Sequence, residues 1–148
     1  YHPKIILAGR VLNDRMGYYV ASELIKKMKT KHIQIQGSKI LIMGLTFKEN
    51  CPDIRNSGIK NVITKLKNFG CELNLYDPYV DKKEIKQIYD IYPNSKLNKN
   101  RYDAVLIAVA HNTFKTIGLS NIRDLCKKKH VIFDLKNLFN SNQVDLKL

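Results

Sequence analysis

One run of apolar residues constrains the fold more than any other feature of the chain. Residues 103–110 read Asp-Ala-Val-Leu-Ile-Ala-Val-Ala, with apolar side chains at both odd and even positions. A strand exposed on one face would alternate apolar and polar residues, so this run predicts a central parallel strand covered on both faces. Three shorter runs predict companion strands at 39–44, 72–76 and 131–135.

Residues with helical spacing fill the intervals between these strands. One long amphipathic helix is expected from Ile5 to Met28. Its apolar residues recur at every fourth position, at Leu12, Met16, Val20, Leu24 and Met28. A second helix is predicted over 59–66, with Ser57 as its N-cap and Gly70 as its C-terminal stop. Weaker helical segments are expected at 81–89, 113–117 and 122–127.

The alternation of strands and helices defines the fold class. It predicts an α/β protein, a Rossmann-like doubly wound parallel sheet preceded by a long N-terminal helix. The 148 residues suit one hydrophobic core. We therefore expect residues 1–36 to form the helical part and residues 37–148 to form one compact α/β unit.

The net charge of +13 is high for this length and is compatible with nucleic acid, an anionic surface or a small anionic ligand. The lysines are scattered over predicted helix faces, among Asn, Ile and Tyr. This scatter favours a solvated basic surface. A stand-alone basic α/β module that binds nucleic acid or another polyanion remains the alternative hypothesis.

Other sequence features concern cysteines, membranes and the chain start. The three cysteines are odd in number and have no CxxC spacing, so neither a disulfide framework nor a metal site is predicted. No apolar run approaches the length of about 18 residues that a membrane span needs. The chain opens with Tyr1 rather than Met. We therefore expect a soluble cytoplasmic domain that begins at an internal cut.

Parallel α/β sheets bind ligands at the carboxyl ends of their strands, near the point where strand order reverses. The first such loop, residues 44–57, runs from a strand to a helix start and carries Lys48 and Arg55. It has one glycine where a dinucleotide fingerprint has three, so phosphate recognition by these cations fits better than a dinucleotide site. Alternatively, the two cations simply pair with Glu49 and Asp53 in a surface loop.

The loop sequence Gly-Leu-Thr-Phe-Lys-Glu-Asn-Cys-Pro-Asp-Ile-Arg-Asn-Ser resembles the hallmark of the UDP-glucose/GDP-mannose dehydrogenase family in its C-terminal, UDP-sugar-binding domain. The likeness continues in family order through further segments at 8–14, 75–78, 103–111 and 133–136. The Lys-Glu-Asn-Cys-Pro variant is similar to the UDP-N-acetylhexosamine 6-dehydrogenase branch. The resemblance implies oxidation of a UDP-N-acetylhexosamine to its uronate with NAD, for surface polysaccharide biosynthesis.

The resemblance also implies roles for three residues. Lys48 and Lys136 correspond to substrate-binding positions, although the family commonly has Arg at the second. Arg55 corresponds to a cofactor-binding position. The family's Gly-Gly-x-Cys nucleophile segment is absent from this sequence, and Cys51 stands in a different motif. No catalytic residue is therefore predicted, and the chain alone is expected to be inactive.

In the family, the long helix joins two domains and builds a dimer, so a homodimer or higher homo-oligomer is expected. The NAD of such an enzyme would be bound mainly by the preceding domain. Two further polar residues follow predicted strands, Asp77 and His111. We interpret Asp77 as a turn former and His111 as a hydrogen-bonded structural residue, and place neither in the site.

Overall fold

The computed structural model describes residues 3–55, 57–94 and 96–148, with side chains from residue 15 onward. Its centre is a parallel sheet of five strands in the order β2-β1-β3-β4-β5. The strands are β1 Lys39–Met43, β2 Glu72–Tyr76, β3 Tyr102–Ile107, β4 Cys126–Asp134 and β5 Leu146–Lys147. The predicted doubly wound parallel α/β fold is confirmed, and β3 lies fully buried at its centre.

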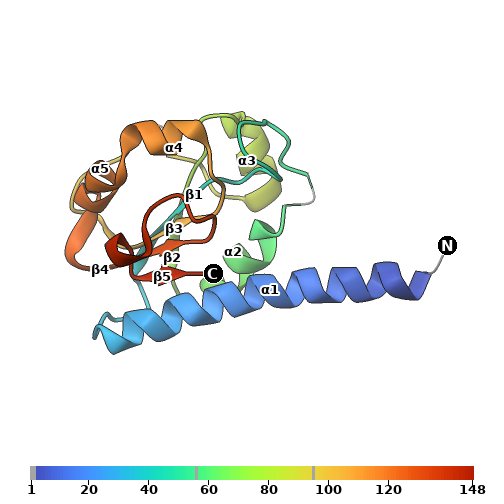
Figure 1. Ribbon diagram of the computed structural model, residues 1–148, viewed down its shortest axis with the longest axis horizontal. Coiled ribbons are helices and arrows are strands. Elements are labelled where there is room, and N and C mark those ends of the chain that lie inside the picture. Colours follow the sequence, from blue (N-terminus) through green and yellow to red (C-terminus); the bar gives the residue numbers. More distant parts are fainter. Residues whose placement is uncertain (1–2, 56, 95) are drawn as a thin grey trace.

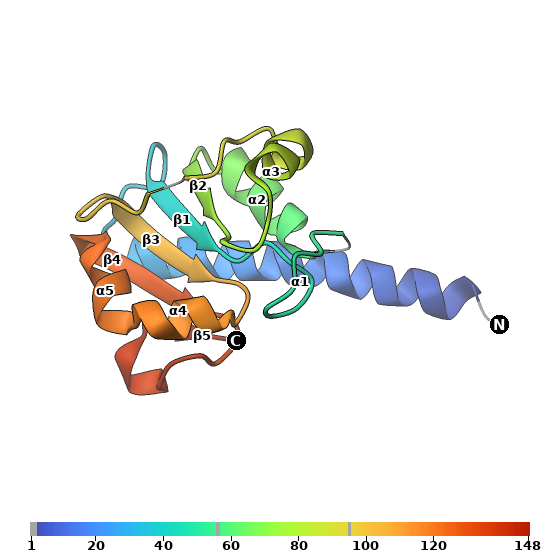
Figure 2. The ribbon, with the colours of Figure 1, turned by 90° about the horizontal axis from the view of Figure 1, so that it is seen from above.

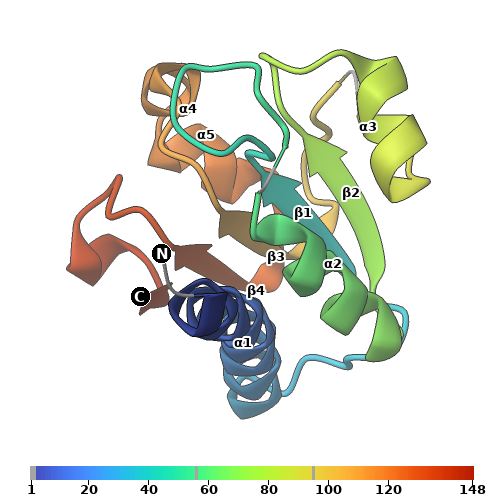
Figure 3. The same ribbon diagram turned by 90° about the vertical axis from the view of Figure 1, so that its right-hand side faces the viewer.

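Helices cover both faces of this sheet. They are α1 Pro3–Thr30, α2 Ile59–Asn68, α3 Lys82–Tyr89, α4 Asn112–Ile117 and α5 Leu119–Asp124, and a 3-10 turn spans Ser141–Gln143. One face packs against α1 and α2, and the other packs against α4 and α5, while α3 lies beyond the β2 edge (Figure 3). Two hydrophobic clusters result, one on each side of the sheet.

The long first helix is confirmed and has two parts. Val20, Leu24 and Met28 are buried against the sheet, whereas Met16 is 48% exposed. The amino-terminal half of α1 projects well past the α/β body (Figures 1 and 2). Gly17 lets α1 pass close to the start of α2, because a Cβ at this position would lie 2.8 Å from Cβ of Asn61. The side chains of the predicted row before residue 15, including Leu12, lie outside the described part.

Some predicted boundaries were wrong. Strand β4 begins at Cys126 rather than Val131, so the helix expected over 122–127 ends at Asp124. The first half of β4 exposes three consecutive lysines, 127–129, and this polar run concealed the strand. Strand β3 ends at Ile107, three residues before its apolar run does. Strand β5 was not predicted, because it is short and half-buried.

For helix α2, the predicted N-cap was wrong and the predicted C-terminal stop is confirmed. The N-cap is Gly58 rather than Ser57, although Ser57 Oγ lies 3.4 Å from the backbone nitrogen of Ile59. Gly70 does terminate the helix, with a left-handed φ of +85°. Its N–H donates to the carbonyl of Lys67, and the next N–H reaches the carbonyl of Leu66. The second strand and the α3 helix lie where the sequence placed them.

Candidate functional site

The carboxyl ends of β1 and β3 meet at the centre of the sheet, where strand order reverses. Gly44 follows β1 with φ of +98°, and a Cβ there would lie 2.7 Å from Cβ and 2.8 Å from the backbone nitrogen of Val109. The two chains thus approach so closely that only glycine fits. The loops that leave β1 and β3 diverge from this point, which is where doubly wound sheets form ligand sites.

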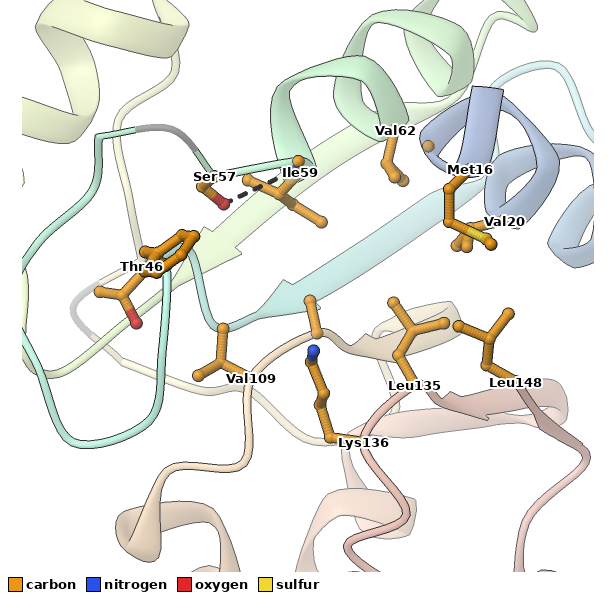
Figure 4. A pocket seen from close by; sticks show the side chains of 14 residues that line it. Met16, Val20, Thr46, Ser57, Ile59, Val62, Val109, Leu135, Lys136 and Leu148 are labelled. Carbon is orange, nitrogen blue, oxygen red and sulfur yellow. Dashed lines mark hydrogen bonds between the residues drawn. The ribbon is translucent and has the colours of Figure 1, made fainter. Parts of the chain in front are cut away.

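A cavity of about 290 Å³ lies beside this point (Figure 4). Its walls come from α1, the start of α2, and the segments that follow β1, β3 and β4. Most of the wall is apolar, contributed by Met16, Val20, Phe47, Ile59, Val62, Ala108, Val109, Leu135 and Leu148. The volume and the apolar walls suit a flat organic group rather than an ion alone.

Polar groups gather at one part of the cavity. The Lys136 side chain points into it from the loop after β4, and Ser57 and Thr46 line it from the loop after β1 (Figure 4). The amino end of α2, at Gly58 and Ile59, also lines it, and the first turn of α2 carries no acidic residue. A helix start and an ammonium group together favour an anion at this end of the cavity.

The loop from 44 to 58 is a closed turn with an exposed tip. The backbone N–H of Phe47 donates to the carbonyl of Asp53 at 2.9 Å, and Thr46 Oγ1 donates to the carbonyl of Lys48 at 2.8 Å. Ile54 is 3% exposed and anchors the returning chain in the core. Lys48 is exposed on the tip and does not line the cavity.

Arg55 makes an ion pair on the surface. Its Nε lies 3.0 Å from Asp53 Oδ1, and its side chain is 82% exposed. The hydrogen bonds from Arg55 lower the pKa of the Asp53 carboxyl, and the carboxylate raises the pKa of Arg55 in return. The pairing considered as the alternative for this residue is therefore present. Lys48 and Lys136 form no ion pair with any described residue.

Asp77 and His111 form a buried pair behind the loop. His111 Nε2 lies 3.0 Å from Asp77 Oδ2, and both side chains are fully buried. Asp77 also accepts hydrogen bonds from the backbone of Leu45 at 2.7 Å and of Tyr79 at 2.9 Å. The turn expected at Asp77 is confirmed, and His111 is hydrogen-bonded as expected, but their joint contact with the β1 loop was not predicted.

Asp134, at the end of β4, holds the turn that follows it through backbone hydrogen bonds, as Asp77 does after β2. Its carboxylate is buried and accepts hydrogen bonds from the backbone of Lys136 at 3.1 Å and of Phe139 at 2.9 Å. These bonds fix the turn that carries Lys136. The sequence pointed to Lys136 through the resemblance alone, whereas the structure explains how its backbone is held at the cavity.

The cysteines of the chain are free. Cys71 and Cys126 are buried, and burial raises the pKa of both thiols, that of Cys126 to about 12. Cys51 is partly exposed and free. Within the described ranges, no three His, Cys, Asp or Glu residues are grouped so that they could hold a metal ion. None of the described helices offers an apolar stretch that could cross a bilayer.

The structure thus brings one of the three predicted residues, Lys136, to the cavity, and leaves Lys48 and Arg55 on the neighbouring exposed loop. The contribution of α1 and of Leu148 to the cavity was missed. No local pattern marks these residues as neighbours, because they are distant in sequence from the loops that they face. Of the four strand-end segments at which the sequence would place a ligand site, 44–56 and 134–138 contribute to this cavity, whereas 77–80 and 110–114 do not line it.

Comparisons with known proteins show what this chain is similar to. A protein-family model described as "UDP-glucose/GDP-mannose dehydrogenase family, UDP binding domain" matches residues 41–141. UDP-N-acetyl-D-glucosamine 6-dehydrogenase of Salmonella typhi is 48% identical over 148 residues, 100% of this chain and 35% of that protein. The enzyme of the same name from Pseudomonas aeruginosa is 45% identical over the same shares.

Solved structures resemble the fold in the same way. The UDP-N-acetyl-mannosamine dehydrogenase Cap5O from Staphylococcus aureus superposes with a TM-score of 0.72 at 27% identity. The superposition covers 99% of this chain and 34% of that one. The chain therefore spans about a third of the length of the relatives that it matches.

Proposed function

Because the chain belongs to the UDP-glucose/GDP-mannose dehydrogenase family, in which it matches the UDP binding domain, we propose that it holds the UDP-sugar of an NAD-dependent UDP-N-acetylhexosamine 6-dehydrogenase. The observation that carries this proposal is the cavity at the carboxyl edge. Its apolar walls suit a nucleobase, and the polar end formed by Lys136 and the start of α2 suits a diphosphate. The names of the most similar relatives support an N-acetylhexosamine as the sugar.

We propose distinct contacts for the three basic residues. Lys136 would bind a phosphate inside the cavity, and Lys48 would bind the ligand from the adjoining loop. Arg55 would face the cofactor of the whole enzyme. The β1 loop does not fit the pyrophosphate of NAD, because it has one glycine where a dinucleotide fingerprint has three, and Val109 packs against that glycine, Gly44. In this proposal NAD is bound mainly by the part of the enzyme that this chain does not span.

Calorimetry with UDP on the 148-residue chain tests the binding site. Lys136→Ala and Lys48→Ala are each expected to weaken UDP by about 1.5–3 kcal/mol, the range for a hydrogen bond to a charged group. Lys128→Ala is the matched control, since it removes the same charge from an exposed lysine in the first half of β4. Unchanged affinity in both site variants would place the phosphate elsewhere. An equal loss in Lys128→Ala would favour the polyanion-binding alternative.

We also propose that the chain self-associates through α1 and that the whole enzyme is a cytoplasmic homo-oligomer. Met16 and Tyr19 are 48% and 53% exposed on α1, and Phe47 and Leu148 add exposed apolar surface. Large exposed apolar side chains in one region favour association. Sedimentation should detect dimers or larger species that Tyr19→Lys reduces. A strictly monomeric wild-type chain at high concentration would contradict this.

A further inference from the structure

We propose that His111 is the positioning residue of the candidate site, because its imidazole bridges Asp77 to the backbone of Asn50 and thereby fixes the loop that carries Lys48. This inference rests on the proposed function for its consequence in UDP binding. The bridge itself is a property of the chain without ligand. Its two partners belong to different strand-end segments, one after β2 and one after β1.

Both ring nitrogens of His111 are engaged in the bridge. The backbone N–H of Asn50 donates to Nδ1 at 2.9 Å, so Nδ1 must present its lone pair. The proton therefore sits on Nε2, which lies 3.0 Å from Asp77 Oδ2 and 3.4 Å from Thr46 Oγ1. The ring packs between Tyr79, at 4.6 Å, and Phe114, at 5.1 Å between centroids. The imidazole has little freedom to turn.

The side chain of Asn50 accepts two further hydrogen bonds that hold the tip of the loop. Asn50 adopts a left-handed conformation with φ of 57°. Its side-chain Oδ1 accepts hydrogen bonds from the backbone of Asn112 at 2.9 Å and from Tyr79 Oη at 3.2 Å. One exposed residue is thus fastened to the segments after β2 and β3, and its backbone N–H is held by the fully buried side chain of His111.

Lys48 lies two residues before Asn50 in the same closed turn, and its carbonyl accepts the Thr46 hydroxyl. Release of the Asn50 N–H would loosen the tip of this turn, which would then be held by the Asn50 side chain and the Thr46 hydroxyl, and Lys48 would have to be ordered further when ligand binds. A flexible lysine loses binding free energy to that ordering, whereas a fixed turn has already been ordered on folding. His111 therefore acts on the ligand through Lys48 and not by contact.

Two substitutions distinguish the hydrogen bond to Asn50 from the hydrogen bond to Asp77. In His111→Asn the side-chain oxygen can replace Nδ1 and accept the Asn50 N–H. In His111→Gln the side-chain amide nitrogen can replace Nε2 and donate to Asp77, while the Asn50 N–H loses its acceptor. We expect amide exchange at Asn50, followed by NMR without ligand, to accelerate at least about tenfold in His111→Gln. The Asn variant should stay close to wild type.

Calorimetry with UDP on the same proteins measures the consequence. His111→Gln should weaken UDP by no more than Lys48→Ala does, and the double variant should lose little more than Lys48→Ala alone, because both changes act on one contact. Retained affinity in His111→Gln despite rapid exchange at Asn50 would overturn the positioning role. So would slow exchange at Asn50 in His111→Gln.

The imidazole ¹⁵N spectrum of the wild-type chain provides a test that does not depend on the folding of any variant. A proton on Nε2 and none on Nδ1 is expected, and the opposite tautomer would overturn the bridge. Absence of UDP binding by the wild-type chain would defeat the proposed function. In that case the Asn50 exchange and the ¹⁵N spectrum would still decide whether His111 holds the loop.

Discussion

At the carboxyl ends of β2 and β4, Asp77 and Asp134 each accept hydrogen bonds from two backbone N–H groups. At the amino ends of β3 and β5, Asp103 and Asp145 each accept one backbone N–H and one lysine ammonium. The same residue type is thus satisfied in two different ways. At the amino ends lysines donate to these two aspartates, whereas at the carboxyl ends backbone N–H groups do so, joined at Asp77 by His111.

This difference affects what the basic residues can do. Lys31 and Lys127 are engaged by aspartates of the fold. Lys48 and Lys136 lie outside every ion pair that the described part of the chain contains, although Asp53 and the buried Asp134 lie nearby in sequence. An anionic ligand at the carboxyl end would therefore meet cations that are not already neutralised. The net charge of +13 alone could not have revealed this division.

The largest effect is expected from disruption of the carboxyl end at Gly44. Gly44→Ala combines a strained backbone at φ of +98° with a Cβ placed within 3 Å of Val109. We expect the free energy of unfolding in urea to fall by about 3 kcal/mol. Gly37→Ala is the control, since it shares a positive φ of +80° but has open space around the new Cβ. An equal loss in both variants would show that the contact with Val109 is unimportant.

A smaller change in the free energy of unfolding should distinguish Asp134, held by backbone groups, from Asp103, which is paired with a lysine. Asp134→Ala leaves two N–H groups without their acceptor, and we expect it to cost about 2–3 kcal/mol. Asp103→Ala releases one N–H and the ammonium of Lys127, whose side chain is 47% exposed and can return to water. About 1 kcal/mol is expected there. Urea unfolding of both variants compares them, and a larger loss for Asp103→Ala would contradict the division between the two ends.

At the amino end of the sheet, the stabilisation provided by Asp145 should depend on pH. Burial favours the protonated form of Asp145, but hydrogen bonds from Lys31 and the Ile132 backbone outweigh it and hold the pKa of Asp145 below its ordinary 3.8. A lowered pKa in the folded state means that the stabilisation is present above pH 3.8 and is lost as the pH falls through the folded value. Asp145→Asn should therefore cost about 1 kcal/mol at pH 7 and almost nothing well below pH 3.8. A cost in urea unfolding that did not change with pH would contradict the role of this charge.

The sequence predicted the parts of this comparison that depend on local patterns. The buried strand at 103–107 and the helix starting near residue 59 follow from apolar spacing, and Gly70 follows from the chemistry of helix ends. The first half of β4 was missed, because three exposed lysines hide a strand whose pairing is decided by its neighbour β3. The end of a strand is likewise set by its partner and not by its own composition, as at Ile107.

The candidate site was predicted less completely, and for a physical reason. Lys136 was reached through resemblance, and Lys48 and Arg55 through their place in a loop at a strand end. The bridge joins His111 to Asn50, 61 positions away, and to Asp77, 34 positions away, and no periodicity in one sequence encodes such contacts. The apolar wall from α1 depends in the same way on how the helix packs. Long-range packing therefore determines which predicted residues reach the cavity.

The smallest change in stability is expected for Arg55→Ala. Unlike Lys48 and Lys136, Arg55 has a carboxylate partner, so this variant sharpens the comparison. The Arg55–Asp53 pair is exposed, so water screens it and Arg55→Ala should leave the melting temperature unchanged. The lost hydrogen bonds should nevertheless let the pKa of Asp53 rise toward 3.8, which an NMR titration of its carboxyl detects. UDP affinity should stay at the wild-type value, because Arg55 is paired with Asp53 and, in our proposal, faces the cofactor of the whole enzyme. A marked loss of UDP affinity in Arg55→Ala would assign this residue to the nucleotide sugar and would remove the distinction that we draw between it and Lys136.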